Sequence, residues 1–269
     1  MNAFVHHFSF EFRTGIRNKQ LLLLNYLFPL GFYLMMGFIM PGINPPFRED
    51  LIPAMVVFGV LAATFLGIPD PLVNAREKGI YRSYKINGVP SPSILIIPAL
   101  TTTLHLMIVA GIIVASAPVL FDAPLPTDWG AFLLTFLAFT LACSGLSVLI
   151  GVVSPNSRMT VLWSQVMFVP SMLLGGLMFP YSLLPEAAGR FAQLLPATHA
   201  MNAFKSLGMG RAADFTPWGS ISVLALSGIL AFALAVYLFS WDSKNAERRG
   251  HLLLALLAFL PFVVGISIF

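Results

Sequence analysis

Seven apolar runs, each long enough to cross a bilayer as a helix, divide this sequence from residue 21 to residue 269. Each run is about 20 residues long, and a helix of that length spans the ~30 Å hydrocarbon core. Only 10% of the residues are charged, whereas a soluble domain carries about 25%. Lipid offers the backbone no hydrogen-bond partners, so such segments fold as helices. We therefore predict an all-α polytopic membrane protein with six transmembrane helices and a seventh candidate at the C-terminus: Leu21–Met40, Leu51–Val73, Ile94–Ala117, Ala131–Val153, Met159–Phe179, Pro217–Trp241 and His251–Phe269.

The first 20 residues have an amphipathic pattern. Apolar side chains recur at every fourth position, at Phe4, Phe8, Phe12 and Ile16. This spacing predicts an interfacial helix over residues 1–20, lying in the headgroup plane. The alternative is a charged tail.

Residues 180–216 are too apolar for a solvated loop, and they are interrupted by proline. Pro185 and Pro196 exclude one continuous helix. We expect two short helices that form an extracellular re-entrant hairpin.

The distribution of positive charge predicts the orientation, because cytoplasmic loops of membrane proteins are enriched in Lys and Arg. With the N-terminus in the cytoplasm, the outer segments hold only Arg48, Arg190, Lys205 and Arg211. A C-terminus outside the cell follows if the last run crosses the membrane. We expect a multi-pass protein of the cell membrane whose inner segments hold Arg13, Arg17, Lys19, Arg76, Lys78, Arg82, Lys85, Arg158, Lys244, Arg248 and Arg249.

The segment from Asn74 to Pro92 is the most basic interruption between two apolar runs. Gly79 breaks it after a charged triplet, and Gly88 and Pro90 end it. The pattern predicts a short helix or turn at the inner surface, presented to a soluble partner. The alternative is a loop that only orients the protein.

The sequence contains no pattern typical of a catalytic or metal site. The five histidines lack HExxH spacing, a phosphate-binding GxxxxGK[ST] loop is absent, and Cys143 is the single cysteine. The basic residues lie between apolar runs, so we expect no nucleic-acid partner. Asp70 could be a proton-coupling acid or a residue that bonds locally at a helix end. Asp70 and His105 together leave open a membrane-embedded enzyme that modifies lipids.

Three stretches resemble the ABC-2 family of permeases, the membrane subunits of ATP-driven exporters. They are the N-terminal amphipathic helix, the segment Arg76-Glu77-Lys78-Gly79 with its basic continuation to Pro90, and the region from Leu174 to His199. The family has a coupling helix at the second stretch, and the third stretch looks like its fifth span and extracellular re-entrant hairpin. The resemblance covers residues 1–241, which we treat as one transmembrane domain. Residues 242–269 form an additional hydrophobic segment.

The resemblance implies a function and a set of site residues. A separate nucleotide-binding ATPase subunit would bind ATP and Mg²⁺, and this chain would hold no cofactor. It would pair with a second permease subunit, identical or different, and export a drug-like, lipidic or peptide substrate. The alternatives are a proton-coupled secondary carrier and the lipid-modifying enzyme. Contacts to the ATPase would come from Arg76, Glu77, Lys78, Gly79, Tyr81, Arg82 and Tyr84, and the substrate path would use Phe58, Phe65, Phe168 and Met172.

Overall fold

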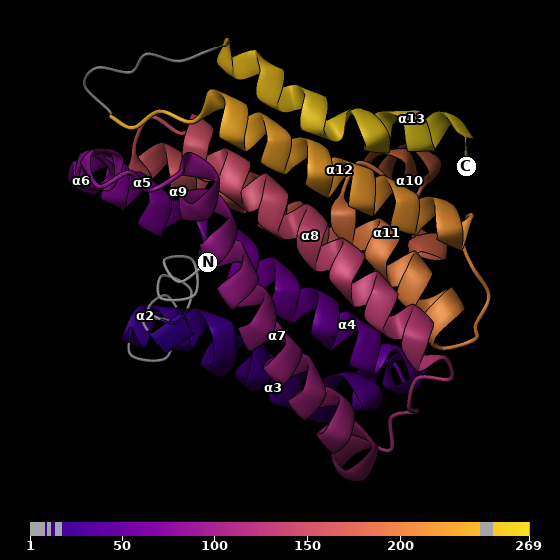
Figure 1. Cartoon of the computed structure of the whole chain (residues 1–269). Coiled ribbons are helices and arrows are strands. Elements are labelled where there is room, and N and C mark those ends of the chain that lie inside the picture. Colours follow the sequence, from indigo (N-terminus) through magenta and orange to yellow (C-terminus); the bar gives the residue numbers. More distant parts are fainter. Residues whose placement is uncertain (1–8, 10–11, 14–17, 243–249, 269) are drawn as a thin grey trace.

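The structure is a computed structural model, and it describes residues 9, 12–13, 18–242 and 250–268. These residues form a bundle of helices, without strands in the described part of the chain (Figure 1). The predicted interfacial helix lies mostly outside the described residues, as does the charged segment 243–249. The elements are α2 (Lys19–Leu22), η1 (Leu23–Leu27), α3 (Phe28–Ile43), α4 (Phe47–Leu61), η2 (Ala62–Leu66), α5 (Pro69–Glu77), α6 (Ile80–Ile86), α7 (Ser91–Phe121), α8 (Trp129–Val153), α9 (Ser157–Leu174), η3 (Tyr181–Leu183), α10 (Glu186–Ala192), α11 (Pro196–Ala203), η4 (Phe204–Gly208), α12 (Pro217–Leu238), η5 (Leu252–Phe259) and α13 (Leu260–Ile268).

Five helical stretches of the described residues are long and apolar enough to cross a membrane: Lys19–Ile43, Phe47–Glu77, Ser91–Phe121, Trp129–Val153 and Pro217–Leu238. They correspond to the first four predicted spans and the sixth. The predicted fifth span is shorter than expected, because α9 ends at Leu174 and not at Phe179. Gly175 follows the helix and Gly176 has a φ of 86°, a left-handed conformation that glycine adopts without steric cost.

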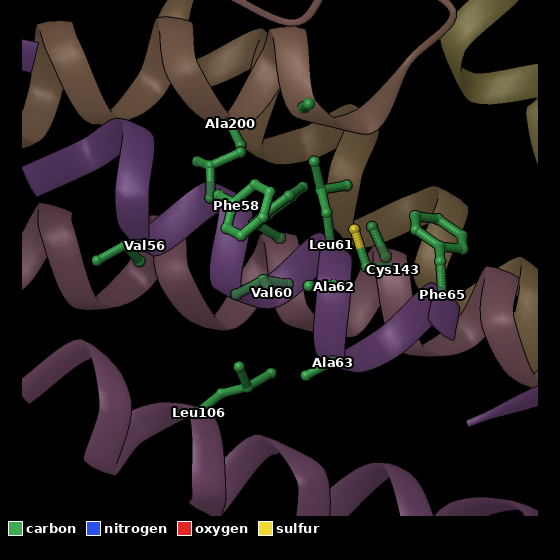
Figure 2. Packing of buried hydrophobic residues seen from close by; sticks show 14 of the residues in the cluster. Val56, Phe58, Val60, Leu61, Ala62, Ala63, Phe65, Leu106, Cys143 and Ala200 are labelled. Atoms are coloured by element: carbon green, nitrogen blue, oxygen red, sulfur yellow. The ribbon is translucent and has the colours of Figure 1, made fainter. Parts of the chain in front are cut away.

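The centre of the bundle is the continuous helical stretch α4–η2–α5. In the most apolar 18 residues of this stretch, 94% of the residues are buried. Figure 2 shows why: Leu106 of α7, Cys143 of α8 and Ala200 of α11 approach the same stretch from different sides. The stretch contains the π-helical turn η2, and π-helical turns often occur at functional sites.

Helices α8 and α12 form the most extensive helix pair. Small residues permit this, Gly145 on α8 and Gly228 on α12. A Cβ atom at Gly145 would lie 2.7 Å from the carbonyl oxygen of Gly228, and one at Gly228 would lie 2.8 Å from the amide nitrogen of Ala142. Close backbone approach of this kind is how membrane helices gain packing contacts.

The segment after α9 folds back into the bundle as two short helices, α10 and α11. Pro185 precedes α10 and Pro196 begins α11, positions at which the missing N–H and the fixed φ of proline are tolerated. Every residue of α11 is buried. The segment thus contains two short helices whose starts coincide with these prolines.

The C-terminal segment lies along α12 (Figure 1). The hydroxyl of Ser227 donates to the carbonyl of Ala258 at 2.8 Å, and the ring centroid of Phe262 lies 5.4 Å from that of His199. Eight residues of η5 are 3₁₀-helical and nine of α13 are α-helical. A 3₁₀-helix rises about 2.0 Å per residue and an α-helix about 1.5 Å. Together η5 and α13 are therefore about 30 Å long.

Candidate functional site

The basic segment contains a short helix, α6, held between two glycines in the left-handed conformation. Helix α5 continues to Glu77, so the predicted loop from Asn74 begins as helix. Lys78 ends α5, and Gly79 with a φ of 73° turns the chain into α6. Gly88 has a φ of 71° and directs the chain toward α7. The glycines thus fix α6 as a separate element at one end of the bundle (Figure 1).

Tyr81 anchors the inner side of α6. Its side chain is 4% exposed, and its ring lies 5.5 Å from the ring of Phe239, just beyond α12. Tyr84, one turn later, is half-buried and lies 6.2 Å from Tyr81 between ring centroids. These tyrosines therefore face the bundle. A partner that docks on α6 would touch them only at the edge of its contact.

The outer side of α6 combines apolar and charged side chains. Ile86 is 85% exposed and Ile80 is 41% exposed. Arg82 pairs with Asp242, which follows α12. We call the exposed set the α6 surface: Glu77, Lys78, Ile80, Arg82, Lys85 and Ile86.

Arg76 is placed differently from the other predicted partner-binding residues. It is 4% exposed. Its guanidinium donates to the carbonyl of Val152 at 2.7 Å and to that of Ser154. These carbonyls lie at the end of α8, where the last turn of a helix has no intrahelical donors. Arg76 therefore ties α5 to α8 and contributes no exposed charge.

Asp70, in the first turn of α5, makes a second connection. Its carboxylate accepts hydrogen bonds from Asn74 at 2.7 Å and from the hydroxyl of Ser157 at the start of α9. The bond to Asn74 is local, whereas the bond to Ser157 joins residues 87 positions apart, and neither partner is the local backbone or the basic side chain expected for a carboxylate at a helix end. Together, Arg76 and Asp70 join α5 to the ends of α8 and α9.

The opposite end of the bundle has no excess of positive charge, because its four cations face six carboxylates: Glu49, Asp50, Asp122, Asp128, Glu186 and Asp214. Lys205 lies 3.1 Å from Asp50, and Arg211 lies 3.1 Å from Glu49 and also pairs with Asp50. Arg190 and Arg48 are likewise paired with carboxylates. All four cations at this end are thus neutralised, whereas Lys78, Lys85 and Arg158 add positive charge at the α6 end. The sequence pattern does not reveal this network, because partners such as Arg211 and Asp50 are 161 residues apart.

The four residues predicted to line a substrate path lie at the packed seam between the central stretch and α9. Phe58 and Phe65 are fully buried, Phe168 is 7% exposed and Met172 is half-buried. The ring centroids of Phe58 and Phe168 are 6.0 Å apart, and Phe32 stacks on Phe58 at 3.9 Å. Figure 2 places Phe58 and Phe65 at different levels of the central stretch. The seam is closed by these side chains.

Asp70 and His105 do not share a hydrogen-bonded group. Nδ1 of His105 lies 2.7 Å from the hydroxyl of Tyr26, whereas Asp70 bonds Asn74 and Ser157. Among the described residues, no three His, Cys, Asp or Glu side chains are grouped as a metal site would require.

Comparison with known proteins agrees with this architecture. The family model described as "ABC-2 type transporter" matches residues 3–207. The chain is also 22% identical over 242 residues to a protein of Bacillus subtilis (strain 168) named "Putative transport permease YvfS", covering 88% of this chain and 97% of that protein. No solved structure gives a significant match. Because the family match extends over most of the sequence, the chain belongs to the ABC-2 type transporter family and is a multi-pass transport permease.

Proposed function

We propose that this permease is the membrane subunit of an ATP-driven exporter, and that the α6 surface is where a separate nucleotide-binding ATPase docks. The observation that carries the proposal is the exposed α6 helix, fixed between Gly79 and Gly88. An isoleucine that is 85% exposed beside lysine and arginine suits a groove on a soluble domain. The apolar side chain supplies affinity and the charges supply register.

In this proposal the α6 end faces the cytoplasm. The unpaired excess of positive charge at that end supports this orientation. The described start of the first span then places the N-terminus inside, and the hairpin α10–α11 faces the exterior. The length of η5 and α13 supports a seventh crossing, which would put the C-terminus outside.

ATP binding would act through the contacts that Arg76 and Asp70 of α5 make with other helices. ATP and Mg²⁺ belong to the ATPase subunit, and closure of that subunit would displace α6. The displacement would reach α8 through Arg76 and α9 through Asp70. Because α9 packs against η2, its movement would open the seam between Phe58 and Phe168.

The second permease subunit would pack on the exposed face of α9. That face presents Leu162, Val166 and Val169. The substrate would pass along the opened seam between the subunits. Its wall of phenylalanine and methionine suits a drug-like, lipidic or peptide molecule with apolar groups.

Copurification tests the proposal. The tagged chain, expressed with the genes that neighbour its own, is expected to bring down an ATPase. Ile86→Glu should lose this subunit, because a charge would enter the apolar contact. The matched control is Ile43→Glu at the opposite end of the bundle, where Ile43 is 73% exposed. Equal recovery of the ATPase with both variants would contradict the proposal.

A further inference from the structure

A cavity of about 250 Å³ lies beneath α6, between the first turns of the N-terminal span, α5 and α7. Tyr81 and Tyr84 of α6 form part of its wall, and leucine, isoleucine and proline side chains form most of the remainder. It is separate from the seam at Phe58 and Phe168, which none of its lining residues belongs to.

Polar side chains converge on this cavity from two helices. Asn25 comes from the π-helical turn η1 and is 3% exposed. Thr101, Thr102 and His105 come from α7 and are 5%, 8% and 1% exposed. Polar groups buried this deeply in a membrane segment are costly unless they have partners.

His105 is the clearest sign of a missing partner. Nδ1 of its ring lies 2.7 Å from the hydroxyl of Tyr26. The ring of Phe12 stacks on the imidazole with a centroid separation of 4.5 Å. Nε2 is buried and has no hydrogen-bond partner among the described residues. The imidazole is therefore held at the wall of the cavity by Tyr26 and Phe12, with Nε2 left without a hydrogen bond.

The lining also limits the charge of such a molecule. Among the described side chains that line the cavity, none is an aspartate, glutamate, lysine or arginine. An ion would lose its hydration there without gaining a counter-ion, which is strongly unfavourable. The hydroxyl of Thr101 already donates to the carbonyls of Ile97 and Pro98. An uncharged group that can both donate and accept hydrogen bonds matches the remaining amide, hydroxyl and imidazole of Asn25, Thr102 and His105.

We propose that this cavity is a binding site for an uncharged amphipathic molecule, whose hydroxyl-bearing head lies among Asn25, Thr102 and His105. The cavity holds a group of fragment size, so the apolar remainder extends toward lipid. Tyr81 and Tyr84 contact the head, and an occupied site therefore sets the position of α6. The binding claim itself does not depend on the proposed export function, because it is measured on the permease alone.

Cysteine protection tests the site, since the native Cys143 is fully buried. Thr102→Cys is labelled with N-ethylmaleimide in the full-length permease, reconstituted in phosphatidylcholine nanodiscs. The probe is 4-hexylresorcinol, whose two hydroxyls and alkyl chain have the required chemistry. At a probe concentration about four times its Kd we expect labelling to slow about fivefold, because only the empty site reacts. Thr103→Cys is the control, because Thr103 faces the groove between α7, α8 and α12.

Two control compounds with the same hexylbenzene skeleton and one lipid complete the experiment. Hexylbenzene lacks the polar head and 4-hexylbenzenesulfonate carries a charge, so neither should protect Thr102→Cys. Nanodiscs containing dioleoylglycerol test whether a lipid with an uncharged headgroup is the source of the ligand, and protection by this lipid also supports the site.

Binding of radiolabelled 4-hexylresorcinol provides a second measurement. Thr102→Val should weaken its saturable binding about fivefold, because it removes one hydroxyl without changing side-chain size. Failure of N-ethylmaleimide to reach Thr102→Cys would overturn the proposal, as would equal protection by hexylbenzene. Unchanged binding to Thr102→Val would do the same.

Discussion

Replacement of Arg76 by methionine tests whether this residue is structural or a contact for the ATPase. Arg76 is 4% exposed and donates to the carbonyls of Val152 and Ser154. A hydrogen bond from a charged donor is worth about 1.5–3 kcal/mol. Methionine fills much of the same volume, so the loss is mainly electrostatic. Two bonds of this kind give an expected loss of about 3–6 kcal/mol in the free energy of unfolding.

The control is Arg82→Met, which also removes one positive charge from the basic segment. The Arg82 side chain is 54% exposed, and its ion pair with Asp242 is close to solvent. An exposed ion pair contributes about 1 kcal/mol or less. Both free energies can be measured by titrating the purified permease from dodecyl maltoside into SDS and following helical circular dichroism. Equal destabilisation by the two variants would refute the structural role of Arg76.

Four further outcomes follow from the geometry. Gly145→Ala should lower the free energy of unfolding in SDS by about 1–3 kcal/mol, because its Cβ would lie 2.7 Å from a backbone oxygen. Gly111→Ala is the control, because a Cβ there has open space and should not destabilise the protein. Equal losses would contradict the close approach of α8 and α12. Asp70→Asn should keep transport and lower the free energy of unfolding by about 1 kcal/mol, because one hydrogen-bond acceptor is lost. If the variant does not transport, and if transport by the native protein depends on a pH gradient, the secondary carrier is favoured. Glu77→Ala should leave membrane insertion unchanged while ATP hydrolysis continues without transport, so unchanged transport would remove Glu77 from the mechanism. Alkaline phosphatase fused after residue 269 should be active, because a seventh crossing would put the C-terminus outside; activity only of a cytoplasmic reporter would contradict that crossing.

The apolar length of the runs predicted most of the helical architecture. Apolar residues cannot leave the bilayer without a large cost, so five of the predicted spans reappear as helices long enough to cross. Local chain chemistry predicted the finer features equally well. Gly79 and Gly88 bracket α6, and Pro185 and Pro196 separate the helices of the hairpin, because each acts on its own backbone.

Features that depend on distant partners could not be predicted from the sequence. Arg76 looks like any other cation of the basic segment, because its partners are carbonyls 76 and 78 residues away. Phe58 looks like any phenylalanine of a span, and only the packing of α4 at the centre of the bundle explains its complete burial. The end of α9 at Leu174 was also missed, since the apolar pattern continues to Phe179.

Photo-crosslinking from position 86 tests most directly whether α6 is the docking element. A benzophenone amino acid replaces Ile86, which is 85% exposed, in the full-length chain expressed together with its neighbouring genes. We predict a crosslink to a nucleotide-binding subunit, identified by mass spectrometry, and no such product when the same amino acid replaces Ile43. A crosslink to that subunit from position 43 but not from position 86 would contradict the account, as would the absence of any crosslinked ATPase.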